Sequence, residues 1–585
     1  MKSSLPSIEV GPQTRSDLLR IVITIITIIA FLFWRFQYGM NRYFDIDEFA
    51  HLHWSYNTFL GYRPYTDFFY FFPPLFLYVF FPLFWLIGKS VSILIVARGL
   101  SFGIFLMSAI VLFFLIKRIR GSKVAWLAVL VFCFLPIPSD KWIEVRPDLI
   151  GVLMGLLGMY FLVRGLKEEK AGNFFLTGFF YTTSVLIVPK FIFQFFVAGG
   201  IIVFYLLWLK KEVGKVIKPL IWGMIVPSVI TFLFLVSYGD LGKSVFLFTK
   251  VATEATRVLG SKFPIPANFF FYPNDIYYGA PVMSLPYVAN LIIWMAAIIA
   301  VVLSVVSFLD EKDKGDCLIK MLLSSTLLIN LLTYIHIFPL KHSQYLLPIS
   351  PFIAYYFALF IEKIIEVSEK IQRVGKIFEN IFLLGIIILI LLSGREMYRW
   401  KLSWPKMDFS YYSRLFGVLP EKEKVYDLTG EAIFSPDGYY FCCIPYGQYE
   451  EALTFPIPSL EKELRKNRVK FINIQYDARL SVIPAINQQV IKRYYTVYPL
   501  GNPPFLMVAG TMIEFEKGEQ EKEIDIIAGG NYRFFWNNGE LLGRDVETLL
   551  RIDGKRVSSM PLYLAEGKHL ITASDKGILK VMYRW

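Results

Sequence analysis

The sequence from Ile21 to His53 reads IVITIITIIAFLFWRFQYGMNRYFDIDEFAHLH. Its first half is apolar and matches a membrane-spanning helix, which needs about 20 mostly apolar residues. The second half carries three carboxylates within four positions and then two imidazoles: Asp45, Asp47, Glu48, His51 and His53. Carboxylates beside a membrane surface are costly unless they are solvated or paired. This acidic segment is therefore a candidate functional site.

The acids also have a plain structural use. Asp45 or Asp47 could cap a helix that runs from Glu48 to Leu60, because Asp is a favoured N-cap residue. The residues alone do not separate a catalytic role from a capping role, and both readings stay open at this point.

The composition extends the membrane interpretation to most of the chain. Hydrophobic residues make up 55% of the 585 residues, and aromatic residues make up 17%. Soluble domains do not carry this much apolar surface. We expect a retained first helix, because no small-residue cleavage site follows it. The predicted spans are Ile21–Phe36, Gly99–Ile116, Val124–Pro136, Leu149–Val163, Phe174–Val188, Phe191–Leu209, Pro219–Val236, Val288–Leu309, Leu318–Ile337, Tyr345–Ile361 and Ile377–Leu392.

Basic clusters in the short loops orient these spans. They occur at Lys117–Arg120, Arg164–Lys170, Lys210–Lys218, Lys312–Lys320 and Lys363–Lys376. All of them share a side with the basic N-terminal tail if the aromatic, proline-containing run Phe71–Gly88 lies in the interface and does not span. The sequence then predicts about eleven helices in residues 1–394, with an outer loop over 40–90. The N-terminus is expected to be cytoplasmic and the C-terminus extracytoplasmic, in the cell membrane.

The formal net charge of +13 would suggest nucleic acid as a partner in a soluble protein. Here the basic residues gather in the loops that orient the helices, and no separate basic stripe exists. We therefore expect no nucleic-acid binding.

The chain becomes more polar after Leu392. Residues 395–512 alternate strands with amphipathic helices, which predicts an extracytoplasmic α/β domain. Residues 513–585 form short alternating strands with glycine turns, which predicts a small β-sandwich. The stretch Arg551–His569 resembles carbohydrate-binding sandwich modules. The expected strands are Lys424–Leu428, Val469–Tyr476, Phe505–Gly510, Glu523–Ile527, Asn531–Phe535, Leu549–Ile552, His569–Ala573 and Ile578–Tyr583.

The four cysteines carry little information. Cys133 and Cys317 fall in or beside apolar runs. Cys442 and Cys443 are adjacent, and we expect them neither to pair with each other nor to form a zinc site.

Other outer loops carry basic and polar residues. Pro147 and Asp148 suit the first turn of a helix, but this role does not explain Arg146, whose guanidinium suits bidentate phosphate binding. Lys190 could be an ordinary interface anchor. Further candidates are Lys341, His342, Tyr345, Arg63 and Asp67.

A carboxylate base beside several cations is suited to group transfer from a phosphate ester. The base deprotonates an acceptor hydroxyl, and the cations stabilise the leaving phosphate. The sequence has no Walker-type loop and no Rossmann fingerprint, which speaks against a soluble nucleotide-sugar donor.

At these residues the chain resembles the GT-C class of membrane glycosyltransferases. Within that class it is most similar to the branch that holds protein O-mannosyltransferases and lipid A aminoarabinose transferases, and thus to glycosyltransferase family 39. The resemblance covers most of residues 20–395. It rests on Asp47-Glu48, Gly61…Pro64-Tyr65…Asp67-Phe68, Pro73-Pro74-Leu75, Arg146-Pro147-Asp148 and His342…Tyr345…Pro348…Pro351.

The resemblance implies an inverting transfer of a sugar from a polyprenyl phosphate to an acceptor that the sequence does not identify. Asp47 would be the general base, Glu48 would position it, and the extra acid Asp45 leaves the choice of base open. Arg146, Lys190, Lys341 and His342 would hold the donor phosphate. No cofactor is implied, although a divalent metal remains an alternative. His51 and His53, two residues apart, would not share a helical face.

Two other functions fit the architecture. A flippase for a lipid-linked glycan would need charged residues deep in its helices, and the predicted spans are largely free of them. A glycan ligase that uses a lipid diphosphate would differ only in its donor. The C-terminal part could be a structural cap or an acceptor-recognition domain.

Overall fold

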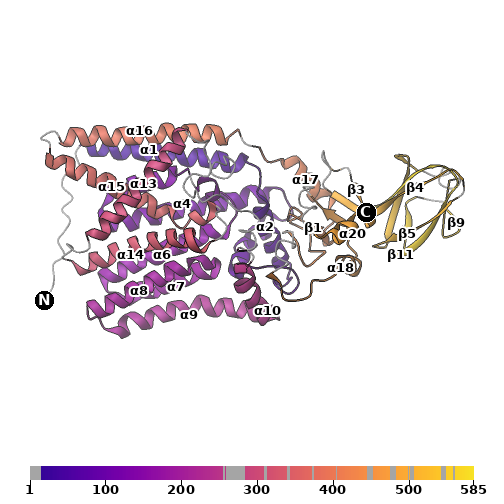
Figure 1. Ribbon diagram of the computed structural model, residues 1–585, viewed down its shortest axis with the longest axis horizontal. Helices are drawn as coiled ribbons and strands as arrows, with labels where there is room; N and C mark the ends of the chain where they lie inside the picture. The colour runs from indigo at the N-terminus through magenta and orange to yellow at the C-terminus, as the bar shows by residue number, and fades with distance from the viewer. Residues whose placement is uncertain are drawn as a thin grey trace. The chain divides into compact units, whose positions relative to one another are not determined.

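Figure 1 shows the structure of the protein, a computed structural model. The structure describes residues 15–136, 138–254, 257, 284–307, 313–338, 343–371, 375–403, 405–443, 452–474, 483–498, 500, 506–518, 520–541, 549–557 and 560–585. These residues form two compact units. The first comprises Met1–Tyr43, Arg98–Ile230 and Pro264–Lys406, and the second comprises Phe44–Ala97, Thr231–Phe263 and Met407–Trp585.

The first unit is a bundle of apolar helices. Eight helices in the described residues are long and apolar enough to cross a membrane. In the described residues the bundle contains these eight and three further helices. Its helices are α1 (Arg15–Asn41), α4 (Ser92–Arg120), α5 (Ser122–Phe134), α6 (Pro147–Glu168), α7 (Ala171–Ile187), α8 (Ile192–Trp208), α9 (Val213–Ser237), α13 (Leu285–Val306), α14 (Lys314–Leu332), α15 (Ser350–Ile371) and α16 (Gly375–Lys401), of which α5, α7 and α15 are the three further helices. Short helical turns η2 (Ser139–Trp142), η3 (Pro189–Phe191), η5 (Thr333–Ile337) and η6 (Ser343–Leu346) lie between them.

Each predicted span overlaps a helix of the structure, so the polytopic helical fold is confirmed, while the last two residues of the span Val288–Leu309 lie outside the described residues. The predicted number of eleven spans is not confirmed, because α5 and α7 have only 13 and 17 residues and α15 is also not among the eight candidate spans. Phe71–Gly88 contains η1 (Pro74–Phe80) and α3 (Phe81–Ile87), a short apolar helical segment. Its interfacial position stays a prediction.

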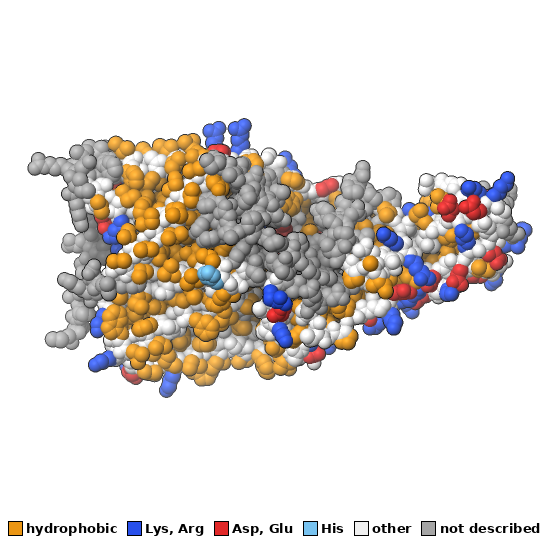
Figure 2. Space-filling model, viewed as in Figure 1, with side chains coloured by type: hydrophobic (Ala, Val, Ile, Leu, Met, Phe, Trp, Pro, Cys, Tyr) orange, Lys and Arg blue, Asp and Glu red, His pale blue; other side chains and the backbone are white. Residues whose placement is uncertain are grey.

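The surface of the bundle suits a hydrocarbon solvent. Figure 2 shows hydrophobic side chains over the visible face of these helices, and Phe196, Leu207 and Trp222 are more than half exposed. Inside the bundle, α7 and α9 cross at glycines. A Cβ on Gly178 would lie 2.2 Å from the Leu220 carbonyl oxygen. Small residues let helix backbones approach this closely in membranes.

Arg98 closes the end of α1. Its guanidinium donates to the carbonyl oxygens of Gly39, Arg42 and Tyr43 at 2.6 to 2.7 Å. The last carbonyls of a helix lack partners within that helix, and a buried arginine supplies them here. This arrangement fixes the backbone directly before the acidic segment.

The second unit begins with that segment. Its helices are α2 (Ile46–Phe59), α3, α10 (Leu241–Phe246), α17 (Phe409–Val418), α18 (Leu460–Lys466) and α20 (Ala485–Tyr494), with η1 and the π-helical turn η4 (Leu247–Val251). Buried aromatic residues, including Trp54, Tyr65, Phe69 and Phe441, form much of its core.

An eight-stranded sheet follows the order β1-β2-β4-β12-β6-β10, with β3 paired to β4 and β7 to β6. A second sheet follows the order β5-β11-β8-β9. The strands are β1 (Val425–Asp427), β2 (Phe471–Asn473), β3 (Tyr495–Tyr498), β4 (Leu506–Phe515), β5 (Gln520–Ile526), β6 (Gly530–Trp536), β7 (Gly539–Glu540), β8 (Leu550–Ile552), β9 (Lys555–Arg556), β10 (Leu562–Leu564), β11 (Gly567–Ala573) and β12 (Gly577–Arg584).

All eight predicted strands are present within a few residues. β1 and β2 pair in parallel, and β2 pairs antiparallel with β4. Side chains of both sheets, among them Phe515, Phe534, Ile571 and Leu579, share one buried core. Because β4 pairs with β2 and with β12, one continuous sheet joins the α/β part to the sandwich. The boundary at 512/513 stays a prediction.

Candidate functional site

The acidic segment forms the N-terminus of α2. Asp45 is the N-cap residue, and its carboxylate accepts from the backbone N–H of Asp47 at 3.0 Å. The Glu48 carboxylate accepts from the backbone N–H of Asp45 at 3.0 Å, so the two acids form a capping box. Asp45 therefore has a structural task, and Asp47 follows in the first turn, where the helix dipole favours a negative charge.

Other predicted residues of the outer loop have structural contacts. Arg63 and Asp67 form an ion pair at 3.1 Å, and Asp67 also accepts from the Arg63 backbone N–H. This pair closes an exposed turn. His51 is buried, and its ring packs against the rings of Phe72 and Phe76.

In the first unit, a buried ionic group surrounds Glu144. Its carboxylate accepts from Arg42 at 2.6 Å, from Lys141 at 2.7 Å, and from Arg146. Glu144 is 0% exposed, so its neighbours decide its charge. Burial by itself raises the pKa of Glu144, but Arg146, Lys141 and Arg42 outweigh it and hold that pKa well below its usual range. Three cations and one carboxylate give this group a formal charge of +2.

Arg146 is also the N-cap residue of α6, with Pro147 at its first position and Asp148 in its first turn, as predicted. The guanidinium donates to the Gln344 side-chain oxygen at 2.6 Å. Lys190 pairs with Asp148 and donates to the Gln344 carbonyl oxygen at 3.0 Å. Arg146 and Lys190 thus meet at Gln344.

The Lys190 ammonium also lies 4.9 Å from the centre of the Tyr345 ring. Lys341 and His342 lie outside the described residues. Sequence reasoning gave no role to Arg42, Lys141, Glu144 or Gln344. An acid flanked by Lys141 and Arg146 was the available signal.

The prediction for Cys442 and Cys443 was wrong, because the two residues form a disulfide. Both are buried, and Cys443 adopts a φ of 73° that few residues other than glycine adopt. No sequence pattern indicates that conformation.

His53 lies beside these cysteines. Its Nε2 is 2.7 Å from the Asp437 carboxylate. Burial disfavours an imidazolium, yet the charge of Asp437 and the hydrogen bond to it outweigh burial and raise the pKa of His53. Burial likewise raises the pKa of Asp437. His53, Asp437, Cys442 and Cys443 could together hold a metal ion. His51 and His53 do not join in one site, in line with their spacing.

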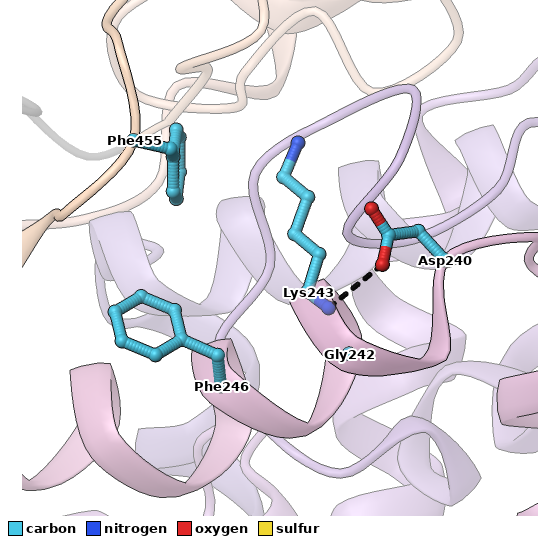
Figure 3. A pocket seen from close by; sticks show the side chains of 5 residues that line it. All are labelled: Asp240, Gly242, Lys243, Phe246 and Phe455. Atoms are coloured by element: carbon cyan, nitrogen blue, oxygen red, sulfur yellow. Dashed lines mark hydrogen bonds between the residues drawn. The ribbon is translucent and has the colours of Figure 1, made fainter.

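The second unit also contains a cavity of about 340 Å³ lined by Asp240, Gly242, Lys243, Phe246 and Phe455. Figure 3 shows the side chain of Lys243 between the two phenyl rings and the Asp240 carboxylate. The Lys243 ammonium lies 4.9 Å from the centre of the Phe455 ring. None of the residues predicted for the site lines this cavity.

No protein-family model matches the chain, and no curated protein matches it. Solved structures do. ArnT from Cupriavidus metallidurans, bound to undecaprenyl phosphate, covers 84% of this chain and 97% of its own, with a TM-score of 0.52 and 12% identity.

The oligosaccharyltransferase of Archaeoglobus fulgidus, tethered with an acceptor peptide, covers 82% of this chain and 72% of its own, with a TM-score of 0.48 and 12% identity. The arabinosyltransferase EmbB from Mycobacterium smegmatis matches over 96% of this chain and 64% of its own, with a TM-score of 0.37 and 10% identity. The likeness to ArnT confirms the predicted fold: the chain has the fold of the GT-C class of membrane glycosyltransferases.

Proposed function

We propose that the protein is an inverting glycosyltransferase that moves a sugar from a polyprenyl-phosphate donor to an acceptor hydroxyl on the extracytoplasmic face. The observation that carries the proposal is the buried cationic group around Glu144 and Arg146 in a GT-C fold. ArnT, which shares the fold, binds undecaprenyl phosphate, a ligand of the proposed donor class.

Asp47 is the proposed general base. Asp45 is occupied with the N-cap, so Asp47 is the better candidate of the two. The Asp47 carboxylate takes the proton of the acceptor hydroxyl, and the oxygen attacks the anomeric carbon from the face opposite the phosphate. The new glycosidic bond forms as the bond between the anomeric carbon and the phosphate oxygen breaks. Polyprenyl phosphate leaves, and the configuration inverts.

The cationic residues stabilise the charge that develops on the leaving phosphate. Arg146 offers a planar donor pair that matches phosphate geometry, and Lys190 adds a point charge. Glu144 and Asp148 hold these two side chains in place. Lys341 and His342 stay proposed contributors on sequence grounds alone.

The decisive experiment compares two classes of lipid-linked sugar donor. Membranes are incubated with radiolabelled polyprenyl-monophosphate and polyprenyl-diphosphate sugars, and transfer to endogenous acceptors is counted. We expect transfer from the monophosphate. Transfer from the diphosphate alone would instead indicate a glycan ligase, and movement of the lipid without transfer would indicate a flippase.

Asp47→Asn should lower transfer at least about 100-fold, the usual contribution of a general base. The matched control is Asp45→Asn, because Asn caps a helix as well as Asp. That variant should keep both activity and unfolding temperature. Normal turnover of Asp47→Asn would exclude Asp47 as the base.

A further inference from the structure

A second candidate site lies in the second unit, where the middle of α2 meets the loop after β1. It consists of His53, Asp437, Cys442 and Cys443, whose possible ligand atoms all lie within 4.8 Å of one another. The loop is held in place at both ends. Gly438 donates its backbone N–H to the Val425 carbonyl oxygen at 2.8 Å, and Cys443 donates its own to that of Asp427 at 2.9 Å. The geometry is therefore built into the backbone.

One hydrogen bond of His53 assigns a proton to Nδ1, which leaves Nε2 as the ring nitrogen that could bind a metal. Its Nδ1 faces the Ala432 carbonyl oxygen at 3.1 Å, which can only accept, so Nδ1 carries a proton. In the neutral ring, Nε2 then presents its lone pair. A histidine that donates one ring N–H to a carbonyl and binds a metal with the other nitrogen is the usual arrangement at metal sites.

Asn57 supports this assignment. Its side-chain oxygen accepts from the Asp437 backbone N–H at 3.3 Å, which turns its amide nitrogen toward the His53 Nε2 at 3.0 Å. Nε2 thus faces one donor, the amide, and one acceptor, the Asp437 carboxylate at 2.7 Å. A lone pair and a carboxylate oxygen at that distance need a cation or a proton between them.

The other carboxylate oxygen of Asp437 gives an independent sign of a ligand. It is buried and has no hydrogen-bond partner among the described residues. A buried carboxylate oxygen without a partner is costly. A metal ion shared with the cysteine sulfurs would satisfy it.

The disulfide decides when such an ion can bind, because thiolates, not disulfide sulfurs, are metal ligands. A dithiol reductant that opens the Cys442–Cys443 bond passes two electrons to the two sulfurs and becomes a disulfide itself. A divalent cation that then binds both sulfurs displaces their two protons. One imidazole, one carboxylate and two thiolates make a four-ligand set suited to Zn²⁺.

We propose that His53, Asp437 and the reduced Cys442 and Cys443 form a zinc site that the disulfide closes. Bound metal would connect His53 of α2, six residues after Asp47, to the loop that follows β1. Oxidation of the cysteines would break that connection.

The test uses the full-length protein in detergent and needs no variant at first. One sample is kept oxidised, and one is reduced with a phosphine, which becomes a phosphine oxide and leaves no thiol to compete for metal. Both are exposed to Zn²⁺ and desalted without oxygen, and metal is counted by mass spectrometry. We expect one bound zinc per reduced chain and none per oxidised chain. Zinc should also raise the unfolding temperature of the reduced form alone.

Variants then locate the site. Cys442→Ser combined with Cys443→Ser should abolish zinc binding, and His53→Gln should weaken it at least 10-fold, in line with loss of one ligand. The matched controls are Cys317→Ser, a buried cysteine elsewhere, and His51→Gln, a histidine two residues away on the same helix. Both should bind like the wild type. Equal zinc binding by the oxidised and reduced chains, or no binding by either, would overturn the proposal. In the latter case a shared proton holds His53 and Asp437 together.

Discussion

Each unit contains a fully buried glutamate, and the two glutamates have neighbours of opposite charge. In the first unit, the Glu144 carboxylate contacts three cations. In the second unit, the Glu431 carboxyl group accepts from the hydroxyl of Tyr412 at 2.8 Å and from the amide of Asn473 at 3.2 Å, close to the carboxylate of Asp427. Both glutamates are 0% exposed, so the difference comes from their neighbours.

Those neighbours give the two carboxyl groups different charges at neutral pH. Cations hold the pKa of Glu144 well below its usual range. Burial, followed by the negative charge of Asp427, raises the pKa of Glu431 to about 8. The Glu144 group is rich in cations, which suits a phosphate, whereas Glu431 holds a proton. Burial alone therefore does not mark a functional acid, because the charge balance around it decides what it can bind.

Removing the charge of Glu144 should have the largest effect. Glu144→Gln leaves three buried cations without their shared counter-charge, and breaking a buried ion pair in this way costs about 3–5 kcal/mol. We expect a lower unfolding temperature in detergent, followed by tryptophan fluorescence, together with loss of transfer. An unchanged unfolding temperature would show that the cations do not depend on Glu144.

The proposed phosphate role of Arg146 predicts a smaller, kinetic effect. Arg146→Lys keeps the charge but loses the planar pair of donors, so the KM for the lipid donor should rise about 10-fold, which corresponds to about 1.4 kcal/mol of binding. The matched control is Arg164→Lys on the same helix, where an i,i+4 pair with Glu168 remains available. Initial rates over a range of donor concentrations separate KM from kcat. An unchanged KM together with an unchanged kcat would contradict a phosphate role.

Glu431 predicts the opposite sign of pH dependence from an ordinary paired acid. The folded state holds this proton more tightly than the unfolded state, so stability from Glu431 is full below pH 4.5 and is lost as pH rises through about 8. The loss is at most about 1.4 kcal/mol per pH unit for one proton. Glu431→Gln should remove this slope between pH 5 and pH 9 in thermal unfolding. A wild-type curve parallel to that of the variant would refute the raised pKa.

The smallest effect belongs to the exposed pair. The Arg63 side chain is 48% exposed, and exposed ion pairs contribute little to stability. Arg63→Gln should leave the unfolding temperature unchanged within error, since the backbone N–H of residue 63 still donates to Asp67. A clear drop in unfolding temperature would show that this exposed pair stabilises the fold as the buried ion pairs do.

The sequence predicted the elements better than the contacts between them. Apolar length marks each helix, and Asp45 three positions before Glu48 is a recognisable capping box. The α2 cap, the first turn of α6 and the strands were therefore within reach of local patterns. Local patterns did not reveal that Arg42 meets Glu144, 102 positions away, or that His53 meets Asp437, 384 positions away.

The vicinal disulfide shows a different limit. Cys442 and Cys443 pair where the backbone departs from regular structure, with Cys443 in a left-handed conformation. Nothing in the sequence around Cys443 indicates that conformation. For the same reason, a metal ligand set that includes these residues was invisible before the fold was known.

The arginine that closes α1 has a consequence for biosynthesis. Arg98 lies 55 to 59 positions after the carbonyls that it binds. As the ribosome makes the chain, α1 is complete long before its final hydrogen bonds can form. The hydrogen bonds from Arg98 that hold the junction before the acidic segment can therefore form only after all of residues 44–97 have been synthesised.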